Sequence, residues 1–276
     1  MKIAYFGGDM FFSCMKVLLT EGHSIISLFT NVPNQNGYDF TQQVCEQAKA
    51  LRIPILYSRP TPIDIEELIK NDCDMIIAAG YGYKIPSWEG HCIKYAINIH
   101  PSLLPVGAGP MPLPYVITKG LEETGVTLHK LSQDWDAGDI VLQKSFPLFG
   151  TENIEELHCE STEIAISRLK LFLKSPKKHW TNAFPQVRKK GDYWPTPEAS
   201  AFNVRYTDDL VTIDRCLRAH RFIDPKGNIE FISDITAWKQ NHSFEPGELV
   251  SQIEGVHLVA TTEGYGSFTL NRKEPQ

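Results

Sequence analysis

Three side chains with complementary chemistry stand in two short segments of the sequence. Asn98 and His100 are separated by one apolar residue at the end of an apolar run, and Asp136 lies in the turn-forming segment 135–139. Because alternate residues of a strand point to the same face, we expect Asn98 and His100 to lie side by side. An amide N–H can bind an oxyanion, an imidazole can exchange a proton, and a carboxylate can orient the imidazole. Together they could run acyl transfer, whereas Asn-x-His alone could equally serve a turn.

Short apolar runs alternate with helical patterns in the first half of the chain. The runs predicted to form strands are Lys2–Phe6, Ser24–Phe29, Ile53–Tyr57, Asp74–Ala79 and Tyr95–Ile99. Such alternation predicts a parallel sheet with right-handed crossovers. The stretch after His100 is crowded with glycine and proline from Gly107 to Pro114 and is therefore expected to be irregular. Irregular backbone directly after a buried strand often carries a functional site.

The second half of the chain changes its pattern twice. Strands are predicted over Glu123–Leu131 and Ile140–Phe146, followed by a helix over Asn153–Leu173 with Thr151 as its N-cap. A helix over Leu210–His220 and short strands between turns then predict a small barrel. The predicted fold is α/β, with a Rossmann-like, mostly parallel sheet and flanking helices in residues 1–175, a linker over 176–197, and a β-rich, OB-like domain in 198–276.

Composition and cysteine spacing exclude several classes of protein. The chain has 276 residues, of which 42% are hydrophobic and 22% charged, as in soluble globular proteins. No apolar run approaches the roughly 18 residues of a membrane span, the N-terminus lacks a signal-peptide pattern, and the six cysteines lack metal-ligand spacing. The first turn, Gly7-Gly8-Asp9, lacks the G-x-G-x-x-G pattern of a dinucleotide site. We therefore expect a cytoplasmic protein with no metal and no membrane partner.

Positive charge is concentrated in one stretch of an otherwise acidic chain. Net charge is −6, yet no acid lies between Glu163 and Asp192, where eight lysines and arginines occur. Such a stretch can mark a nucleic-acid contact, or a solvated helix end followed by a linker. We prefer the second interpretation, because phosphate contacts must be matched by Lys or Arg and the remainder of the chain is acidic.

Longer stretches around the three reactive side chains resemble the formyltransferase family that includes methionyl-tRNA formyltransferase. The matching segments are AAGYGYKIP (78–86), AINIHPSLLP (96–105), ETGVTLHKL (123–131), WDAGDI (135–140), TPE (196–198), RCLRAH (215–220), PGELV (246–250) and GVHLVATTEG (255–264). The resemblance implies formyl transfer from the co-substrate N10-formyltetrahydrofolate to a primary amine. It makes Asn98, His100 and Asp136 the catalytic triad. Asn98 and His100 would polarise the formyl oxygen, while Asp136 would tune His100 and help move the amine proton.

The resemblance also assigns binding residues. Backbone groups of Tyr83, Lys84 and Ile85, and of the turn up to Gly138, would hold the pterin ring of the folate. The first loop would face the amine, which makes Asp9 a candidate substrate contact. No metal is implied.

Two polar residues near the triad receive structural interpretations. His129 stands next to Leu128 in a predicted strand and is interpreted as a structural histidine. Asp139 shares the turn with Asp136 and is interpreted as a turn or capping carboxylate.

Three departures from the tRNA-modifying members favour a small amine as the acceptor. The loop Asn31–Tyr38 contains no Lys or Arg, residues 196–276 carry eight basic against twelve acidic residues, and Val106–Gly109 replaces an arginine-bearing loop. Because Val126–His129 is also more similar to the sugar enzymes, a nucleotide-linked amino sugar is the preferred acceptor. The alternatives are methionyl-tRNA, hydroxylated ornithine, an aminoacyl carrier, or water in a formyltetrahydrofolate hydrolase. The oligomeric state stays open, a dimer included.

Overall fold

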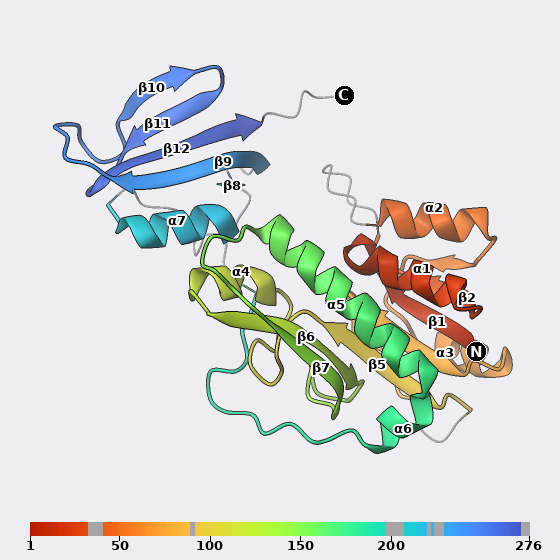
Figure 1. Ribbon diagram of the computed structural model, residues 1–276. Coiled ribbons are helices and arrows are strands. Elements are labelled where there is room, and N and C mark those ends of the chain that lie inside the picture. The colour runs from red at the N-terminus through yellow and green to blue at the C-terminus, as the bar shows by residue number, and fades with distance from the viewer. Residues whose placement is uncertain (33–40, 89–91, 197–206, 220–221, 224–228, 272–276) are drawn as a thin grey trace. The chain divides into compact units, whose positions relative to one another are not determined.

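The chain forms two compact units in a computed structural model (Figure 1). The structure describes residues 1–32, 41–88, 92–196, 207–219, 222–223 and 229–271. Unit 1 comprises residues 1–110, 123–146 and 158–193, and unit 2 comprises residues 111–122, 147–157 and 194–276.

Unit 1 is built on a seven-stranded sheet of order β3-β2-β1-β4-β5-β6-β7. The strands are β1 (Lys2–Gly7), β2 (Ser24–Phe29), β3 (Ile55–Leu56), β4 (Met75–Ala79), β5 (Tyr95–His100), β6 (Glu123–Lys130) and β7 (Ile140–Pro147). Every pairing from β3 to β5 is parallel, and β6 then runs antiparallel to β5. The mostly parallel sheet confirms the predicted α/β class.

Helices flank this sheet and bury its central strands. They are α1 (Phe12–Thr20), which follows the short 3-10 turn η1 (Asp9–Phe11), α2 (Gln42–Ala50), α3 (Pro62–Lys70), α5 (Ile154–Lys174) and α6 (Pro176–Thr181). All five residues of β4 are buried, as expected for a parallel strand covered on both faces. In the core, the rings of Phe6 and Phe29 stack at 4.2 Å between centroids.

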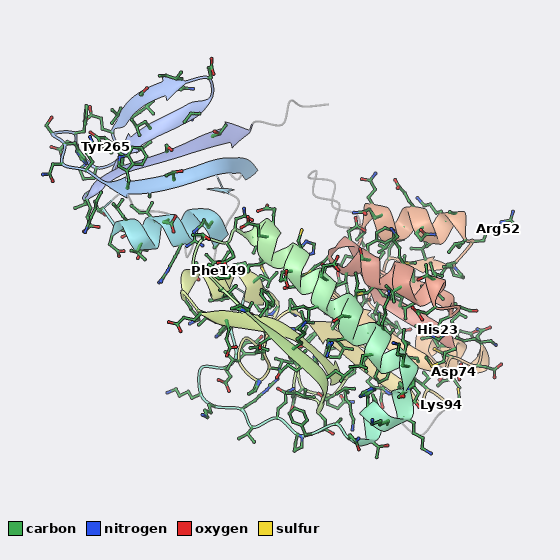
Figure 2. All side chains as sticks on the ribbon, viewed as in Figure 1. His23, Arg52, Asp74, Lys94, Phe149 and Tyr265 are labelled. Carbon is green, nitrogen blue, oxygen red and sulfur yellow. The ribbon has the colours of Figure 1, made fainter. Side chains whose placement is uncertain are left out.

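Charged side chains gather where the central parallel strands begin. Asp74, just before β4, accepts a hydrogen bond from the Lys2 N–H at 2.9 Å and lies 3.2 Å from Lys94 Nζ (Figure 2). These groups tie together the starts of β1, β4 and β5. Asn98 and His100 lie at the other end of β5, as expected for a site at the carboxyl ends of parallel strands.

Two local predictions are wrong for identifiable reasons. The proline-rich stretch is not wholly irregular, because Pro112–Thr118 forms α4, whose first turn tolerates proline since its N–H groups need no intrahelical partner. Thr151 does not cap α5. Instead, Asn153 Oδ1 accepts the Glu156 N–H at 2.8 Å and the Glu156 carboxylate accepts the Asn153 N–H at 3.0 Å. This reciprocal pair is a capping box.

The predicted linker contains ordered elements of unit 1. Residues 176–181 form α6, and Phe184 then bridges to Ile140 through N–H···O bonds of 2.8 and 3.1 Å. The predicted domain boundaries at 175 and 198 are not decided by these contacts and stay a prediction.

Unit 2 contains a second, antiparallel sheet of order β10-β11-β12-β9-β8. Its elements, besides α4, are α7 (Leu210–Ala219), β8 (Phe222–Ile223), β9 (Ile229–Lys239), β10 (Leu249–Ile253), β11 (Val256–Ala260) and β12 (Gly264–Asn271). This sheet confirms the β-rich character predicted for the C-terminal part. Within the described ranges, no helix is both long and apolar enough to cross a membrane.

Candidate active site

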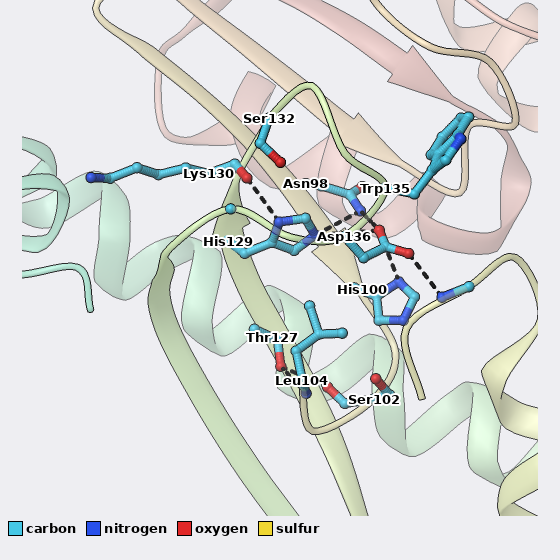
Figure 3. Close-up of polar contacts among 12 residues, drawn as sticks. Asn98, His100, Ser102, Leu104, Thr127, His129, Lys130, Ser132, Trp135 and Asp136 are labelled. Atoms are coloured by element: carbon cyan, nitrogen blue, oxygen red, sulfur yellow. Dashed lines mark hydrogen bonds and ion pairs between the residues drawn. The ribbon is translucent and has the colours of Figure 1, made fainter. Parts of the chain in front are cut away.

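The carboxyl end of β5 brings Asn98 and His100 to the turn that carries Asp136 (Figure 3). Asp136 Oδ1 lies 3.3 Å from Asn98 Nδ2 and 3.7 Å from His100 Nδ1. The three side chains predicted from sequence therefore meet at one carboxylate.

The Asp136 carboxylate is held in its ionised form. Its Oδ2 accepts the backbone N–H of Gly109 at 2.9 Å, and its side chain is only 10% exposed. Burial alone would raise the pKa of this carboxyl. The His129 and His100 rings in their protonated forms, together with the Gly109 N–H, outweigh burial and hold the pKa of Asp136 well below its ordinary value. Asp136 is thus an anion at neutral pH.

His100 has one ring nitrogen committed and one directed at Asp136. The residue is buried, and its Nε2 lies 2.8 Å from the Gly107 carbonyl oxygen. Because a carbonyl only accepts, we assign the proton of the neutral ring to Nε2, which leaves the Nδ1 lone pair facing Asp136. Burial lowers the pKa of His100, and the charge of Asp136 partly opposes this shift. Nδ1 can therefore accept a proton at neutral pH.

His129 belongs to the same cluster, although its sequence context indicated only a structural role. It pairs with Asn98 across β5 and β6. Its Nδ1 lies 2.8 Å from the Lys130 carbonyl oxygen, which only accepts, so we assign the ring proton to Nδ1. Its Nε2 then accepts from Asn98 Nδ2 at 3.1 Å. The ring is therefore satisfied within the fold, as interpreted, but it also orients the Asn98 amide. Only the β5–β6 register reveals this second role.

The turn after Asp136 packs against the end of β6. At Gly138, a Cβ would come within 1.9 Å of the Lys130 carbonyl oxygen, so a side chain there would push the turn away. Asp139 in the same turn pairs with Lys130 Nζ at 2.9 Å, as expected for a turn carboxylate.

The loop after β4 reaches the same turn from the other side. Lys84 Nζ donates to the Gln133 carbonyl at 2.8 Å and lies 5.7 Å from the centre of the Trp135 ring. Tyr83 is half-buried and packs edge-on against Tyr81. Ile85 packs against the core below this loop.

Asp9 performs a structural task at the start of α2. Its two carboxylate oxygens accept the backbone N–H groups of Gln43 at 3.1 Å and Val44 at 2.9 Å. Asp9 thus caps the first turn of α2, where a negative charge is favourable. Its assignment as a substrate contact stays a prediction.

The three side chains of the triad offer an amide, an imidazole and a carboxylate. Among the described residues, no group of three or more His, Cys, Asp or Glu side chains is placed to hold a metal ion. An amide, an imidazole and an ionised carboxylate in mutual contact can stabilise an oxyanion and move one proton.

The known proteins similar to this chain include enzymes named for tRNA and enzymes named for sugars. A family model described as formyl transferase matches residues 1–167. The methionyl-tRNA formyltransferase of Orientia tsutsugamushi (strain Boryong) is 28% identical over 279 residues, covering 96% of this chain and 90% of that protein.

Solved structures share the fold at lower identity. WlaRD, a sugar 3N-formyltransferase solved in the presence of dTDP and 5-N-formyl-THF, superposes with a TM-score of 0.68 and 16% identity over 99% of this chain and 98% of that one. A variant of HypX from Aquifex aeolicus gives a TM-score of 0.67 and 20% identity over 97% of this chain. The chain spans only 43% of that HypX.

Proposed function

The chain belongs to the formyl transferase family, and from that premise we propose that it transfers a formyl group from N10-formyltetrahydrofolate to the primary amine of a small metabolite. The observation that carries the proposal is the meeting of Asn98, His100 and Asp136 at one buried carboxylate. Together with the family, this cluster supports direct acyl transfer between a folate and an amine.

The geometry supports a mechanism with one tetrahedral intermediate. The amine nitrogen attacks the formyl carbon, and an N–H of Asn98 binds the developing oxyanion in place of its long contact with Asp136. His100 Nδ1 accepts the proton that the amine loses, and the nearby carboxylate stabilises the imidazolium. The intermediate then collapses as the bond from carbon to folate N10 breaks, and His100 returns the proton to N10.

The loop after β4 fits the assignment of a folate ring to backbone groups. Within the described part of the chain, the backbone N–H and C=O groups of Tyr83, Lys84 and Ile85 form no hydrogen bond with another residue. The Lys84 side chain holds this loop beside the Asp136 turn, which ends at Gly138. Free donors and acceptors beside the triad are what a flat, polar pterin ring needs.

Binding of the folate should stabilise the protein. We expect N10-formyltetrahydrofolate, or a stable analogue, at about 100 times its Kd to add about 2.7 kcal/mol to the free energy of unfolding. Thermal unfolding with and without the ligand measures this effect. NAD⁺ at the same concentration is the control, because the first turn lacks a dinucleotide motif. A melting temperature unmoved by saturating folate would contradict the proposed co-substrate.

We propose a nucleotide-linked amino sugar as the acceptor. The loop that contacts the triad, Val106–Gly109, carries no charged side chain, and its Gly107 and Gly109 touch His100 and Asp136 through backbone atoms. Residues 196–276 contain eight Lys and Arg against twelve Asp and Glu. A tRNA acceptor would instead require several cations matched to phosphates.

One observation favours methionyl-tRNA as a second candidate. Six lysines are exposed on unit 1 near the end of α5 and beyond it: Lys170, Lys174, Lys177, Lys178, Lys189 and Lys190. The Orientia tsutsugamushi relative is also named for that substrate. A comparison of the two acceptors therefore tests the proposal.

We expect a dTDP-linked amino sugar to be formylated far faster than methionyl-tRNA at both low and physiological salt. The measurement is the release of tetrahydrofolate, with the formylated product identified by mass spectrometry. Release that no amine accelerates would indicate a hydrolase. Glutamate substitution of Lys177, Lys178, Lys189 and Lys190 should leave sugar turnover unchanged, with Lys49→Glu as the control on α2. The proposal fails if methionyl-tRNA is the better acceptor, if the rate of its formylation falls steeply with salt, and if the fourfold variant no longer formylates it.

A further inference from the structure

A segment outside the triad contacts both the turn that carries Asp136 and the loop that binds His100. After α6, residues Phe184–Tyr193 run without a helix along unit 1 (Figure 1). One end of the segment bridges to Ile140, and the other contacts the loop of Gly107 and Ala108.

Gln186 fixes the backbone of the turn that presents Asp136. Its Nε2 donates to the carbonyl oxygens of Asp136 at 2.9 Å and Gly138 at 2.6 Å. Asp136 adopts a φ of +51°, in the left-handed region that is unfavourable for a residue with a Cβ. External hydrogen bonds on both sides of the strained peptide can keep the turn in this conformation.

The side-chain amide of Gln186 has a buried oxygen, Oε1, that is not hydrogen-bonded within the described part of the chain. Leaving a buried acceptor unpaired is unfavourable, whereas an apolar side chain of the same shape would avoid that loss. The amide is therefore poorly explained as packing and well explained by its two donated bonds.

The same segment sets the loop on the other side of the triad. The Asp192 carbonyl accepts the N–H groups of Gly107 at 2.9 Å and Ala108 at 3.1 Å, and Arg188 Nη2 donates to the Trp135 carbonyl at 2.6 Å. Because Gly107 binds His100, one segment positions both the imidazole and the carboxylate.

We propose that Gln186 is a positioning residue for formyl transfer, which holds Asp136 at its distance from His100 through the backbone of the 136–138 turn. The inference rests on the proposed function. It adds a residue that does not touch the reacting atoms and lies 50 positions along the chain from Asp136.

The test compares Gln186→Met, which keeps the length of the side chain but removes both donors, with Val187→Ala, a change at the exposed neighbouring residue. We expect kcat to fall by about 10- to 100-fold in Gln186→Met, because misplacing a catalytic group is costly, while KM for the folate changes less than threefold. Val187→Ala should match the wild type. A lower melting temperature with an unchanged kcat would show a purely structural role and overturn the inference.

A titration of the His100 ring by NMR separates this inference from the proposed function. The charged and titratable groups that act on His100 are Asp136, His129 and Arg188, and Gln186→Met removes none of them. If the turn loosens and Asp136 moves away, the pKa of His100 should fall, because the Asp136 charge raises it. An unchanged His100 titration would overturn the inference even if no acceptor amine is found. A wild-type enzyme that transfers no formyl group would instead refute the proposed function.

Discussion

In the Asp136→Asn variant, formyl transfer is expected to fall by about 10²–10⁴-fold, the contribution typical of a positioned proton-transfer system. The reaction creates an imidazolium at His100, and Asp136 is the carboxylate 3.7 Å from its Nδ1. Asparagine keeps the size of the side chain and an acceptor for the Gly109 N–H, but it removes the negative charge. Single-turnover rates with saturating folate and amine measure the loss.

The pH dependence of the same variant has a defined sign. Neutral His100 is the active form, so in the wild type the acidic limb of kcat/KM should lie below the ordinary imidazole pKa of about 6.5, because burial lowers the pKa of this ring. Removing the Asp136 charge should move that limb to still lower pH, since this charge raises the pKa of His100.

Asp139→Asn is the matched control for Asp136→Asn, because Asp139 stands in the same turn and pairs with Lys130 outside the triad. It should retain wild-type turnover and an unchanged acidic limb. Equal losses in both variants would show that the turn as a whole matters and would count against a specific role for the Asp136 charge.

Asn98→Ala should lower turnover by about 10²–10³-fold, the range for removal of an oxyanion donor. His100→Ala should lower it by about 10²–10⁴-fold, the range for removal of a proton-transfer group. Asn98 provides the amide N–H of the cluster. Its Nδ2 lies near His129 Nε2 and Asp136 Oδ1. His100 binds the Gly107 carbonyl through Nε2, which leaves Nδ1, facing Asp136, to accept a proton. The folate should still bind, so the loss should appear in kcat rather than in KM.

A half-buried imidazole outside the triad provides the control for these two variants. His23 lies near the chain N-terminus, with its Nδ1 3.2 Å from the terminal nitrogen, and His23→Ala should leave turnover unchanged. Thermal unfolding should show that Asn98→Ala and His100→Ala remain folded at the assay temperature. Turnover within a few-fold of wild type in both triad variants would refute the mechanism.

The sequence predicted those features that depend on local pattern. The buried strands were found because apolar runs with flanking turn residues are visible over five or six positions, and β4 and β5 fall where predicted. Asn98 and His100 could be placed on one face because strand geometry alternates with a period of two. The turn containing Asp136 was visible from its composition, and its link to the triad came from the family resemblance.

The features that were missed depend on contacts between distant segments. His129 joins the cluster through the antiparallel pairing of β5 and β6, a register that no local pattern encodes. Gln186 donates to carbonyls about fifty residues earlier, from a stretch whose composition indicated a linker. For α4, proline spacing indicated irregular backbone, although prolines in a first helical turn are compatible with a helix.

Unit 1 extends to Tyr193, and this extension determines where a chimaera of two family members should be joined. An exchange of C-terminal parts between family members, made to transplant acceptor preference, would naturally be cut at residue 175, where the long helix ends and the basic stretch continues. A junction at residue 175 would take the three triad side chains from one parent. The residues that hydrogen-bond to their turn and loop would come from the other parent. A junction after Tyr193 keeps the hydrogen bonds of Gln186, Arg188 and Asp192 within a single parental sequence. We therefore expect chimaeras joined after Tyr193 to keep the triad in place better than chimaeras joined at residue 175.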